Sequence, residues 1–481
     1  VTYMIFNQVE TIMKIQQKYG DKISNSNSEP KIYSTIYAMH KYWAKKPHNI
    51  ISEYIKKYSK KKDIILDPFS GSGIALIEGY NSKRKAVGID INPTAFFLSK
   101  GILNPINIKK FEEEFSKIET ECMEKINSFY KVKRKNKTYV GTHFIWKNNK
   151  LDEVRYKDPK TIISKPTPLD IKLSKSFTYA KIKQFFPKDK LFDNPRINSY
   201  SESRVCDLFT PRNTKALAIL LERISKIKDK NIREIFRLCF SSMLGQTSKM
   251  VFVINNSNTK NGKSKLKTRK LGSWIIGYWI PNEHFEVNVW NSFVTRYTKI
   301  LEAKKIQQDE FGKPEFVNEF KKLKKGDIFL MNKSAIEGLK KIPKNSIDYI
   351  ITDPPHGDRI PYLELSHMWN SWLKNKVNYK NEVIISGAKN RNKSIENYME
   401  LLEKSMTEMV RVLKPNHCLT FIFNTHSERT WQEIFDFTKN IGLKIHDIST
   451  LNYSRNSVVQ EHKEGGLRFD FVLTFKKVKS N

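Results

Sequence analysis

Short apolar segments alternate with segments of helical periodicity in the first hundred residues of the chain. The apolar runs at 64–66 and 85–89 predict buried strands, and the patterns at 51–58, 74–80 and 93–100 predict helices. Strands that alternate with helices at this spacing are typical of a parallel sheet with helices on its faces. This part of the sequence therefore predicts an α/β fold.

The alternation stops after residue 104 and resumes near residue 327. Five further strands are predicted there, at 327–331, 346–351, 418–423, 444–449 and 469–475. A loop rather than a helix separates the last two, which predicts a terminal antiparallel hairpin. We therefore expect a seven-stranded, doubly wound, Rossmann-like sheet with a large inserted domain between its second and third strands.

The interruption divides the chain into four regions. Residues 1–39 are a polar lead-in, 40–104 and 326–481 form the two parts of the sheet domain, and 105–325 form the insertion. Within the insertion, apolar residues at helical spacing over 210–248 predict two helices. We expect the insertion to be a region of its own that can hang over the cleft at the strand ends.

The composition favours a polyanionic partner. The 86 Lys and Arg residues against 50 Asp and Glu residues give a net charge of +36, which attracts nucleic acid, although an AT-rich genome would also produce many lysines. The four cysteines are scattered without a C-x-x-C pair, which argues against a zinc ribbon or a disulfide framework and predicts no metal. The sequence shows no run of about 18 apolar residues. We therefore expect a cytoplasmic protein without a membrane partner.

A glycine-containing turn and a second acidic strand end predict a cofactor site. The turn DPFSGSG at 67–73 opens a helix, so that backbone N–H groups can approach a ligand closely. The segment GIDIN at 88–92 places an acid at the tip of the next strand, where it suits ribose hydroxyls. Because G-x-G-x-x-G is missing, a nucleoside-sized cofactor is favoured over a dinucleotide. The candidate residues are Asp67, Phe69, Gly71, Gly73, Asp90 and Asn92.

The segment HKYWAKKPHN at 40–49 comes one helix before this predicted cofactor site. Taken by itself, it could be a surface loop around a buried tryptophan. Its position allows it to close over the cofactor, and Trp43 is therefore added to the candidate cofactor-binding residues.

The segment TDPPHGD at 352–358 is the most informative part of the chain. Two prolines end the strand 346–351 and leave neighbouring carbonyls without a ladder partner. A carboxylate, free carbonyls and a flat ring at a strand tip suit the planar amino group of a flipped adenine or cytosine. By itself the segment could equally be an ordinary strand exit. The candidate catalytic residues are Asp353, Pro354, Pro355 and His356.

Together these motifs resemble the S-adenosylmethionine-dependent amino-methyltransferases of DNA, in particular a bacterial group of adenine-specific DNA methylases. DPFSGSG resembles their cofactor loop, GIDINP their ribose-binding acid, and DPPH the catalytic tetrapeptide usually written DPPY. IPYLELSHMWNSWL, VCDLFTPRNTKALAILLERI and GLRFDFVLTFKK extend the resemblance, which covers about 40–104 and 205–478. Some members carry a zinc ribbon in the insertion, and this chain lacks its cysteines.

The resemblance implies transfer of a methyl group from S-adenosylmethionine to N6 of an adenine flipped out of double-stranded DNA. Asp353 Oδ and the Pro354 carbonyl would hold the amino group, and orientation would supply most of the rate. Cytosine N4 is an alternative because His356 stands where tyrosine is usual, although Asp353 in place of serine favours adenine. An RNA amino-methyltransferase and a catalytically idle DNA-binding subunit are further alternatives. A bacterial, nucleoid-associated enzyme with a restriction endonuclease or defence-system subunits as partners is expected.

Two groups of residues are predicted to contact the DNA. Tyr362 and Glu364 follow the catalytic turn closely enough to line a base pocket. The segment 255–271 carries six cationic side chains and is followed by Trp274 and Tyr278. A charge run is usually a solvated surface, but this density next to aromatic residues favours phosphate contact. Its candidate residues are Lys265, Lys267, Arg269 and Lys270.

Overall fold

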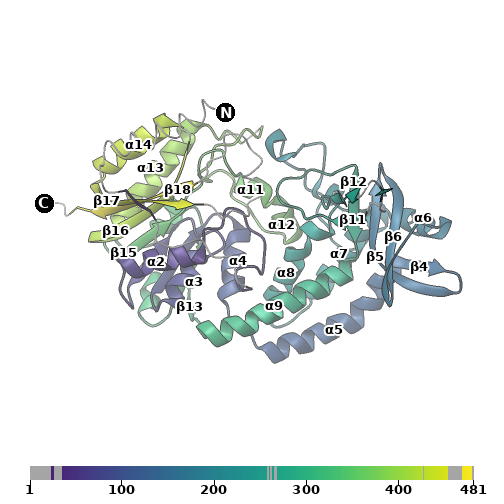
Figure 1. The fold of residues 1–481 in the computed structure, drawn as a ribbon. Coiled ribbons are helices and arrows are strands. Elements are labelled where there is room, and N and C mark those ends of the chain that lie inside the picture. The colour runs from purple at the N-terminus through teal and green to yellow at the C-terminus, as the bar shows by residue number, and fades with distance from the viewer. Residues whose placement is uncertain are drawn as a thin grey trace. The chain divides into compact units, whose positions relative to one another are not determined.

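The computed structural model describes residues 23–25, 35–256, 259–260, 263–264, 268–389, 391–425, 427–452 and 469–478. The chain divides into two compact units (Figure 1). The first, here called the sheet unit, comprises Val1–Pro105, Gln307–Leu363 and Lys376–Asn481. The second, the insertion unit, comprises Ile106–Ile306 and Glu364–Asn375. Each unit is described by itself.

The sheet unit is built on a large, mostly parallel sheet. Nine strands of the described residues form it, in the order β1 (Ile23–Asn25), β17 (Leu443–Asn452), β18 (Phe469–Lys477), β16 (Leu413–Phe423), β15 (Ile347–Thr352), β2 (Ile64–Asp67), β3 (Lys85–Asp90), β14 (Ile328–Asn332) and β13 (Phe316–Val317). Only β18 runs antiparallel to its neighbours β16 and β17, and the other pairs are parallel. The predicted mixed α/β fold and terminal hairpin are confirmed.

The prediction of seven strands was wrong because it left out the two strands at the edges of the sheet, β1 and β13. β1 has three residues and β13 has two, so neither is long enough to show an alternation of apolar and polar positions. Both pair with a longer strand beside them, β1 with β17 and β13 with β14. The partner strand, rather than the local sequence, therefore makes these segments extended.

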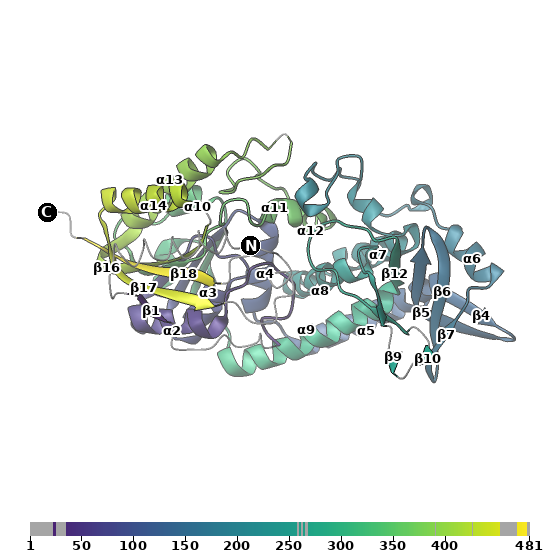
Figure 2. The ribbon, with the colours of Figure 1, turned by 45° about the horizontal axis from the view of Figure 1, so that its top comes forward.

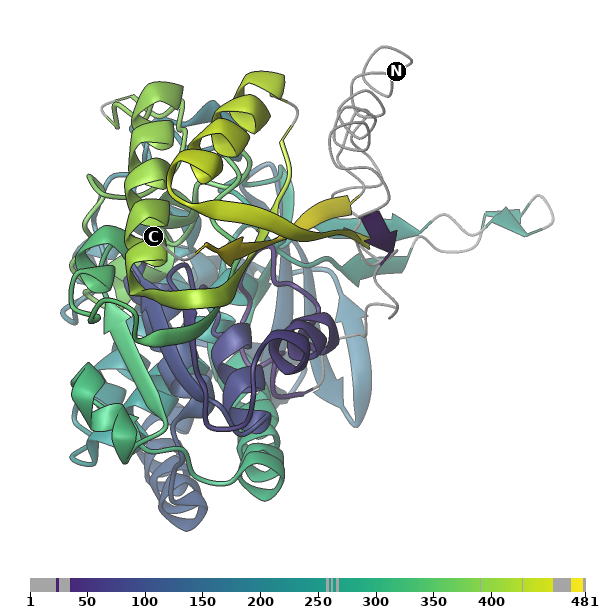
Figure 3. The ribbon, with the colours of Figure 1, turned by 90° about the vertical axis from the view of Figure 1, so that its left-hand side faces the viewer.

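Helices cover both faces of this sheet (Figure 1, Figure 3). On one face, α3 (Ile74–Asn81) packs against α2 (His48–Tyr58) and α4 (Pro93–Leu103). On the other, α13 (Ile395–Val412) packs against α10 (Ala335–Leu339) and α14 (Glu428–Asn440). The apolar face of α13 buries Leu402, Met406 and Met409 in a core that includes residues of β15, β16 and β18. Burial of this apolar surface is what holds the layers together.

The register of the central strands places their carboxyl ends at one edge of the sheet. β2 pairs with β3 in parallel, with Asp67 opposite Gly88, and β15 pairs with β2, with Ile350 opposite Leu66. All six residues of β15 are buried. In open parallel sheets, ligands bind beyond the carboxyl ends of the strands. The acidic residues predicted at these three strand ends therefore come from neighbouring strands.

The insertion unit has an antiparallel sheet and long helices (Figure 2). The sheet order is β12 (Glu283–Val287), β5 (Lys137–Lys147), β6 (Lys150–Asp158) and β7 (Lys160–Ser164), and β4 (Lys131–Arg134) also pairs with β5. The helices are α5 (Ile108–Asn127), α6 (Pro168–Lys175), α7 (Pro211–Ser225), α8 (Lys230–Met243) and most of α9 (Val289–Phe311). The two helices predicted over 210–248 are confirmed as α7 and α8. Two short antiparallel pairs of strands follow α8 in the sequence and precede β12. They are β8 (Val253–Asn256) with β11 (Thr268–Leu271), and β9 (Thr259–Lys260) with β10 (Lys263–Ser264).

A buried ion pair joins α7 to β12 inside the insertion unit. Glu286 accepts hydrogen bonds from the guanidinium of Arg212, from the Thr210 hydroxyl and from the Trp146 indole N–H. The Arg212 guanidinium also lies 4.1 Å from the centroid of the Phe144 ring. Both charged side chains are almost fully buried, so each depends on the other for its stability in the core.

Among the helices that the structure describes, none combines the length and apolar character needed to cross a membrane.

Candidate active site

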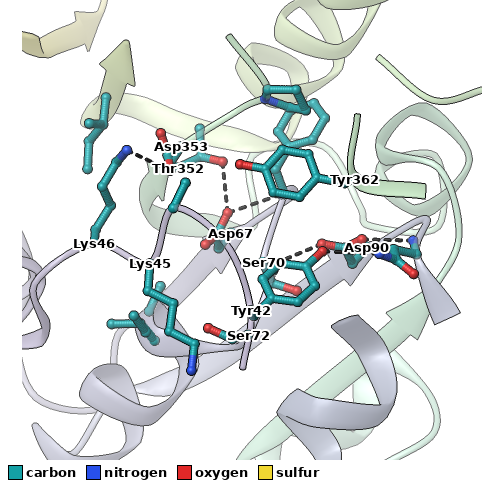
Figure 4. A pocket seen from close by; sticks show the side chains of 18 of the residues that line it. Tyr42, Lys45, Lys46, Asp67, Ser70, Ser72, Asp90, Thr352, Asp353 and Tyr362 are labelled. Carbon is teal, nitrogen blue, oxygen red and sulfur yellow. Dashed lines mark hydrogen bonds and ion pairs between the residues drawn. The ribbon is translucent and has the colours of Figure 1, made fainter. Parts of the chain in front are cut away.

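A pocket of the sheet unit lies at the carboxyl ends of β2, β3 and β15 (Figure 4). It holds about 930 Å³ of empty space, counted with the part that is open to solvent. Its walls come from segments 42–46, 67–75, 90–92, 351–355 and 381–383, together with a few single residues. The pocket therefore joins all three sequence motifs.

Most of the candidate residues that the sequence singled out meet in this pocket. Those that line it are Trp43, Asp67, Phe69, Gly71, Asp90, Asn92, Asp353, Pro355 and Tyr362. Gly73, Pro354, His356 and Glu364 are not part of its lining. Gly73 ends the turn before α3 with φ of +83°, and a Cβ there would lie 2.8 Å from Ser99 Oγ, so this glycine allows close packing of the loop on α4.

Asp67 is held rigidly at the end of β2. Its Oδ1 accepts a hydrogen bond from the Phe69 N–H at 3.0 Å and another from the Thr352 hydroxyl at 2.8 Å. Burial raises the pKa of the Asp67 carboxyl to about 7, because these two hydrogen bonds do not offset the loss of hydration. Asp67 thus titrates near neutral pH inside the pocket.

Asp90 organises the glycine turn from the neighbouring strand. Its carboxylate accepts hydrogen bonds from the Gly71 N–H at 2.7 Å and from the Asn92 N–H at 2.8 Å. Burial raises the pKa of the Asp90 carboxyl to about 6 in spite of these bonds. The Asn92 side chain in turn accepts from the Thr94 N–H and caps α4. The strand end, the turn and the helix start are therefore fixed together.

The walls of this pocket fit a nucleoside-type cofactor with a positive charge. The Ser70 hydroxyl is buried in the wall and, within the described part of the chain, has no hydrogen-bond partner, so it is ready to bind a polar ligand atom. Gly71 has φ of +51°, and its N–H is turned to Asp90. Two carboxyl groups whose anionic forms are disfavoured by burial would be stabilised by a cationic ligand.

Asp353 carries the carboxylate at the end of β15. Its Oδ2 lies 3.0 Å from Lys46 Nζ, and its Oδ1 lies 3.0 Å from His356 Nε2 (Figure 4 shows the Lys46 contact). The side chain is 22% exposed and lines the pocket. Each carboxylate oxygen can accept more than one hydrogen bond, so Asp353 keeps acceptor capacity toward the pocket.

The His356 ring packs against β16 and is not among the residues that line the pocket. His356 Nε2 also lies 3.2 Å from the Ile422 carbonyl oxygen, and the ring packs edge-on against Phe423 at 4.8 Å between centroids. These contacts hold the imidazole against β16. Tyr362, the first residue of α11 (Tyr362–Leu365), lines the pocket instead, and its ring stacks with that of Tyr42 at 5.8 Å.

Glu364 is not among the residues that line this pocket. Glu364 belongs to the insertion unit, where it is fully buried and accepts a hydrogen bond of 2.6 Å from the Asn194 side chain. Tyr362 and Glu364 are two positions apart on a helix and therefore point in different directions. The carboxylate thus holds the segment around Asn194 in place.

The structure describes only part of the cationic segment 255–271. Arg269 contacts three carboxylates, those of Asp152, Glu153 and Glu283. Its guanidinium is therefore bound within the protein, which argues against a phosphate contact. Lys270 is exposed. Lys265 and Lys267 lie outside the described residues.

Many residues that line the pocket were not among the sequence candidates, and three of them are Tyr42, Lys46 and Glu382. Tyr42 and Lys46 flank the predicted Trp43, so the HKYWAKKPHN segment already contained them. Glu382 is buried, accepts a hydrogen bond from the Leu363 N–H at 3.0 Å and pairs with Arg391. It lies in a segment without a recognisable motif, so no local signal could have identified it.

Comparison with known families decides the relationship. A family model described as DNA methylase, for N6 and N4 methyltransferases, matches residues 5–100 and 347–481. The chain belongs to the N6/N4 DNA methylase family. The matched segments contain DPFSGSG, GIDINP and DPPH, and the region between them corresponds to most of the insertion. Membership in this methylase family confirms the expected cofactor, S-adenosylmethionine.

The chain is similar to two curated type II methyltransferases. It is 21% identical over 371 residues to the type II methyltransferase M.MvaI of Kocuria varians, covering 75% of this chain and 62% of that protein. It is 22% identical over 372 residues to M.MjaII of Methanocaldococcus jannaschii, covering 70% and 62%. The match thus spans less than two thirds of either relative. A solved structure titled as the complex of M1.HpyAVI with S-adenosylmethionine is 19% identical, covers 31% of this chain and 54% of that chain, and has a TM-score of 0.17.

The affinity of the chain for S-adenosylmethionine is expected to increase with pH between about 6 and 8. Asp67 and Asp90, with pKa values of about 7 and about 6, are protonated below this range, and a cationic cofactor favours their carboxylates. Binding should therefore release protons, and the affinity should rise by roughly tenfold as the groups ionise. Isothermal titration calorimetry in buffers of different ionisation enthalpy would measure both effects.

Asp67→Asn should remove most of the pH dependence above pH 6.5. Asp309→Asn, at an exposed position of α9, is the matched control and should keep it. A wild-type affinity that stays constant from pH 6 to pH 8 would contradict the assignment of these carboxyl groups to the cofactor site.

Proposed function

We propose that the chain is a DNA amino-methyltransferase that transfers the methyl group of S-adenosylmethionine to N6 of an adenine flipped out of double-stranded DNA. The observation that carries the proposal is the single pocket shared by the DPFSGSG turn, Asp90 and Asp353. A cofactor turn and an amino-binding carboxylate on neighbouring strand ends of one pocket are what this reaction requires. The family match supports the reaction class.

In the proposed reaction, the protein orients two groups and needs no covalent intermediate. S-adenosylmethionine supplies an activated methyl group when it is bound. Asp353 accepts a hydrogen bond from the exocyclic amino group, and the Pro354 carbonyl accepts a second. These acceptors direct the nitrogen lone pair toward the cofactor side of the pocket, and such positioning supplies a large share of the rate.

Tyr362 is proposed to contact the ring of the flipped base. It lines the pocket that Asp353 also lines, whereas the His356 ring packs against β16. Flipped bases are held by stacking on aromatic or apolar side chains as well as by hydrogen bonds. Tyr362 would therefore take the stacking role that the fourth position of the DPPH tetrapeptide does not fill.

The insertion unit is proposed to bind the DNA backbone. On the β4–β5 hairpin, the exposed lysines Lys131, Lys133, Lys135 and Lys137 alternate with other residues, while Val132 is buried on the inner side. An alternating row of cations on the outer face of a hairpin can contact phosphates, and such contacts make affinity fall steeply with salt. This hairpin replaces Arg269 as the candidate phosphate-binding region.

Adenine is the favoured base, with cytosine N4 as the second candidate function because the family includes both activities. Asp353 in place of serine is the residue that favours adenine. The two similar proteins are named as type II methyltransferases, so a cognate restriction endonuclease or other defence-system subunits are proposed as partners.

The proposal is tested by the bases that the protein modifies. The full chain should be expressed in a host without DNA methylation, and the nucleosides of host DNA and RNA should be analysed by mass spectrometry, with methylome sequencing to locate the modified positions. N6-methyladenine in DNA at a fixed sequence is the expected result. N4-methylcytosine in DNA would show that the target base is cytosine rather than adenine. Methylated RNA with unmodified DNA would overturn the proposal.

A further inference from the structure

The carboxylate of Asp353 shares its cation with a second acid from the end of the chain. Lys46 Nζ lies 3.0 Å from Asp353 Oδ2 and 2.9 Å from Asp470 Oδ2. The Lys46 side chain is only 10% exposed, and Asp470, on β18, is fully buried. Lys46 therefore bridges the carboxylate that faces the pocket and one that does not line it.

His356 holds the other oxygen of Asp353. The neighbours of its Nε2, Asp353 Oδ1 at 3.0 Å and the Ile422 carbonyl at 3.2 Å, are both acceptors, so Nε2 must carry the hydrogen. Arg359 Nη1 lies 3.0 Å from Nδ1, and a guanidinium can only donate, so Nδ1 accepts. The two acceptors and the Arg359 donor together place the ring hydrogen on Nε2.

Arg359 closes the cluster around Asp470. Its Nη1 lies 3.5 Å from Asp470 Oδ1, so the buried acid has a cation on each side, Arg359 and Lys46. One cation would be enough to neutralise Asp470. The second, Lys46, lies between the two carboxylates, and Lys46 belongs to the pocket-lining segment 42–46 (Figure 4).

We propose, on the basis of the proposed function, that Lys46 is a positioning residue for methyl transfer, which fixes the Asp353 carboxylate toward the target amino group and is itself held by Asp470. A carboxylate that forms an ion pair with Lys46 at one oxygen and accepts a hydrogen bond from His356 at the other has little freedom to rotate. Its remaining lone pairs then keep a constant direction toward the pocket. In this arrangement His356 supports Asp353 from behind and does not contact the base.

The alternative explanation is that Lys46 only neutralises the buried Asp470. The two explanations differ in the double variant Lys46→Met/Asp470→Asn, which removes the cation together with the buried charge. If Lys46 only neutralises Asp470, the double variant should recover the wild-type rate. If Lys46 positions Asp353, the rate should stay low in the double variant.

The Lys46→Met variant should lower kcat for DNA methylation by about 10- to 100-fold, since small displacements of a positioning group have effects of this size. KM and Kd for S-adenosylmethionine should change by less than about threefold, because the cofactor-binding acids are untouched. Lys46→Arg, which can contact two carboxylates through its planar group, should restore a substantial part of the rate. Lys56→Met, at an exposed position of α2, is the control and should behave as wild type.

A crystal structure of the Lys46→Met variant gives a readout that does not depend on activity. Rotated or multiple conformers of the Asp353 carboxylate are expected. An unchanged, single conformer, an unchanged kcat of Lys46→Met, or a wild-type kcat of the double variant would each overturn the proposal. A wild-type protein that binds cofactor but leaves DNA unmodified would instead refute the proposed function, and the carboxylate conformation would still decide the role of Lys46.

Discussion

Replacement of Asp353 by alanine is expected to abolish most methyl transfer to DNA while leaving cofactor binding nearly intact. The carboxylate lies at the end of β15, lines the pocket and is held from both sides by Lys46 and His356. Without it, the amino group loses the acceptor that is fixed in place before the reaction. Loss of one preorganised hydrogen-bond partner at a reacting group lowers the rate by on the order of 10²–10³.

The measurement is transfer of a labelled methyl group to duplex DNA in single turnover, with the cofactor Kd determined in parallel. Asp353→Asn keeps one oxygen acceptor and should retain more activity than the alanine variant. Asp309→Ala, which removes an exposed carboxylate elsewhere in the sheet unit, is the control. Full methyl transfer by Asp353→Ala would show that another group binds the target base.

The Glu286→Ala variant is expected to destabilise the insertion unit more than any surface change. Glu286 accepts hydrogen bonds from Arg212, Thr210 and Trp146, and the Arg212 guanidinium lies over the Phe144 ring. Burial alone would raise the pKa of Glu286, but Arg212 and these hydrogen bonds outweigh it and hold that pKa below its ordinary value. Alanine leaves a buried guanidinium unpaired, at a cost of about 3–5 kcal/mol in the free energy of unfolding.

Hydrogen exchange measured by mass spectrometry would localise the effect to peptides of α7 and β12. Glu222→Ala, which removes an exposed partner of Lys226 on the same helix, should change stability by less than about 0.5 kcal/mol. The double variant Arg212→Met/Glu286→Leu should be more stable than Glu286→Ala because it leaves no buried charge. Equal protection in Glu286→Ala and wild type would show that the pair contributes little.

Local sequence was sufficient to predict the central strands, the cofactor turn and the catalytic segment. The apolar runs that became β2, β3 and β15 are short, bounded by turn residues and buried, and each is followed by an acid at its carboxyl end. The edge strands β1 and β13 were not predicted, since they depend on partners rather than on their own few residues. The positions of Asp67, Asp90 and Asp353 followed from the topology of parallel strands.

Side-chain direction could not be predicted, because it is set by residues that are distant in sequence. His356 does not line the pocket because its Nε2 lies 3.2 Å from the Ile422 carbonyl oxygen and its ring packs on Phe423 of β16. Arg269 forms ion pairs with carboxylates of β6 and β12. A pattern of residue types shows which groups are present, but competing partners decide which of them remain available to a ligand.

The sequence by itself determined the α/β class, the cofactor turn, and the carboxylate with two prolines, since these depend on backbone geometry within a few residues. The tertiary structure alone decided that His356 packs on β16 outside the pocket lining and that Lys46 holds Asp353. Lys46 bridges Asp353 to an acid near the opposite end of the chain, and that bridge forms only when β18 pairs beside β16. Buried charges must find partners wherever the fold brings them together, and so this contact has no local signature.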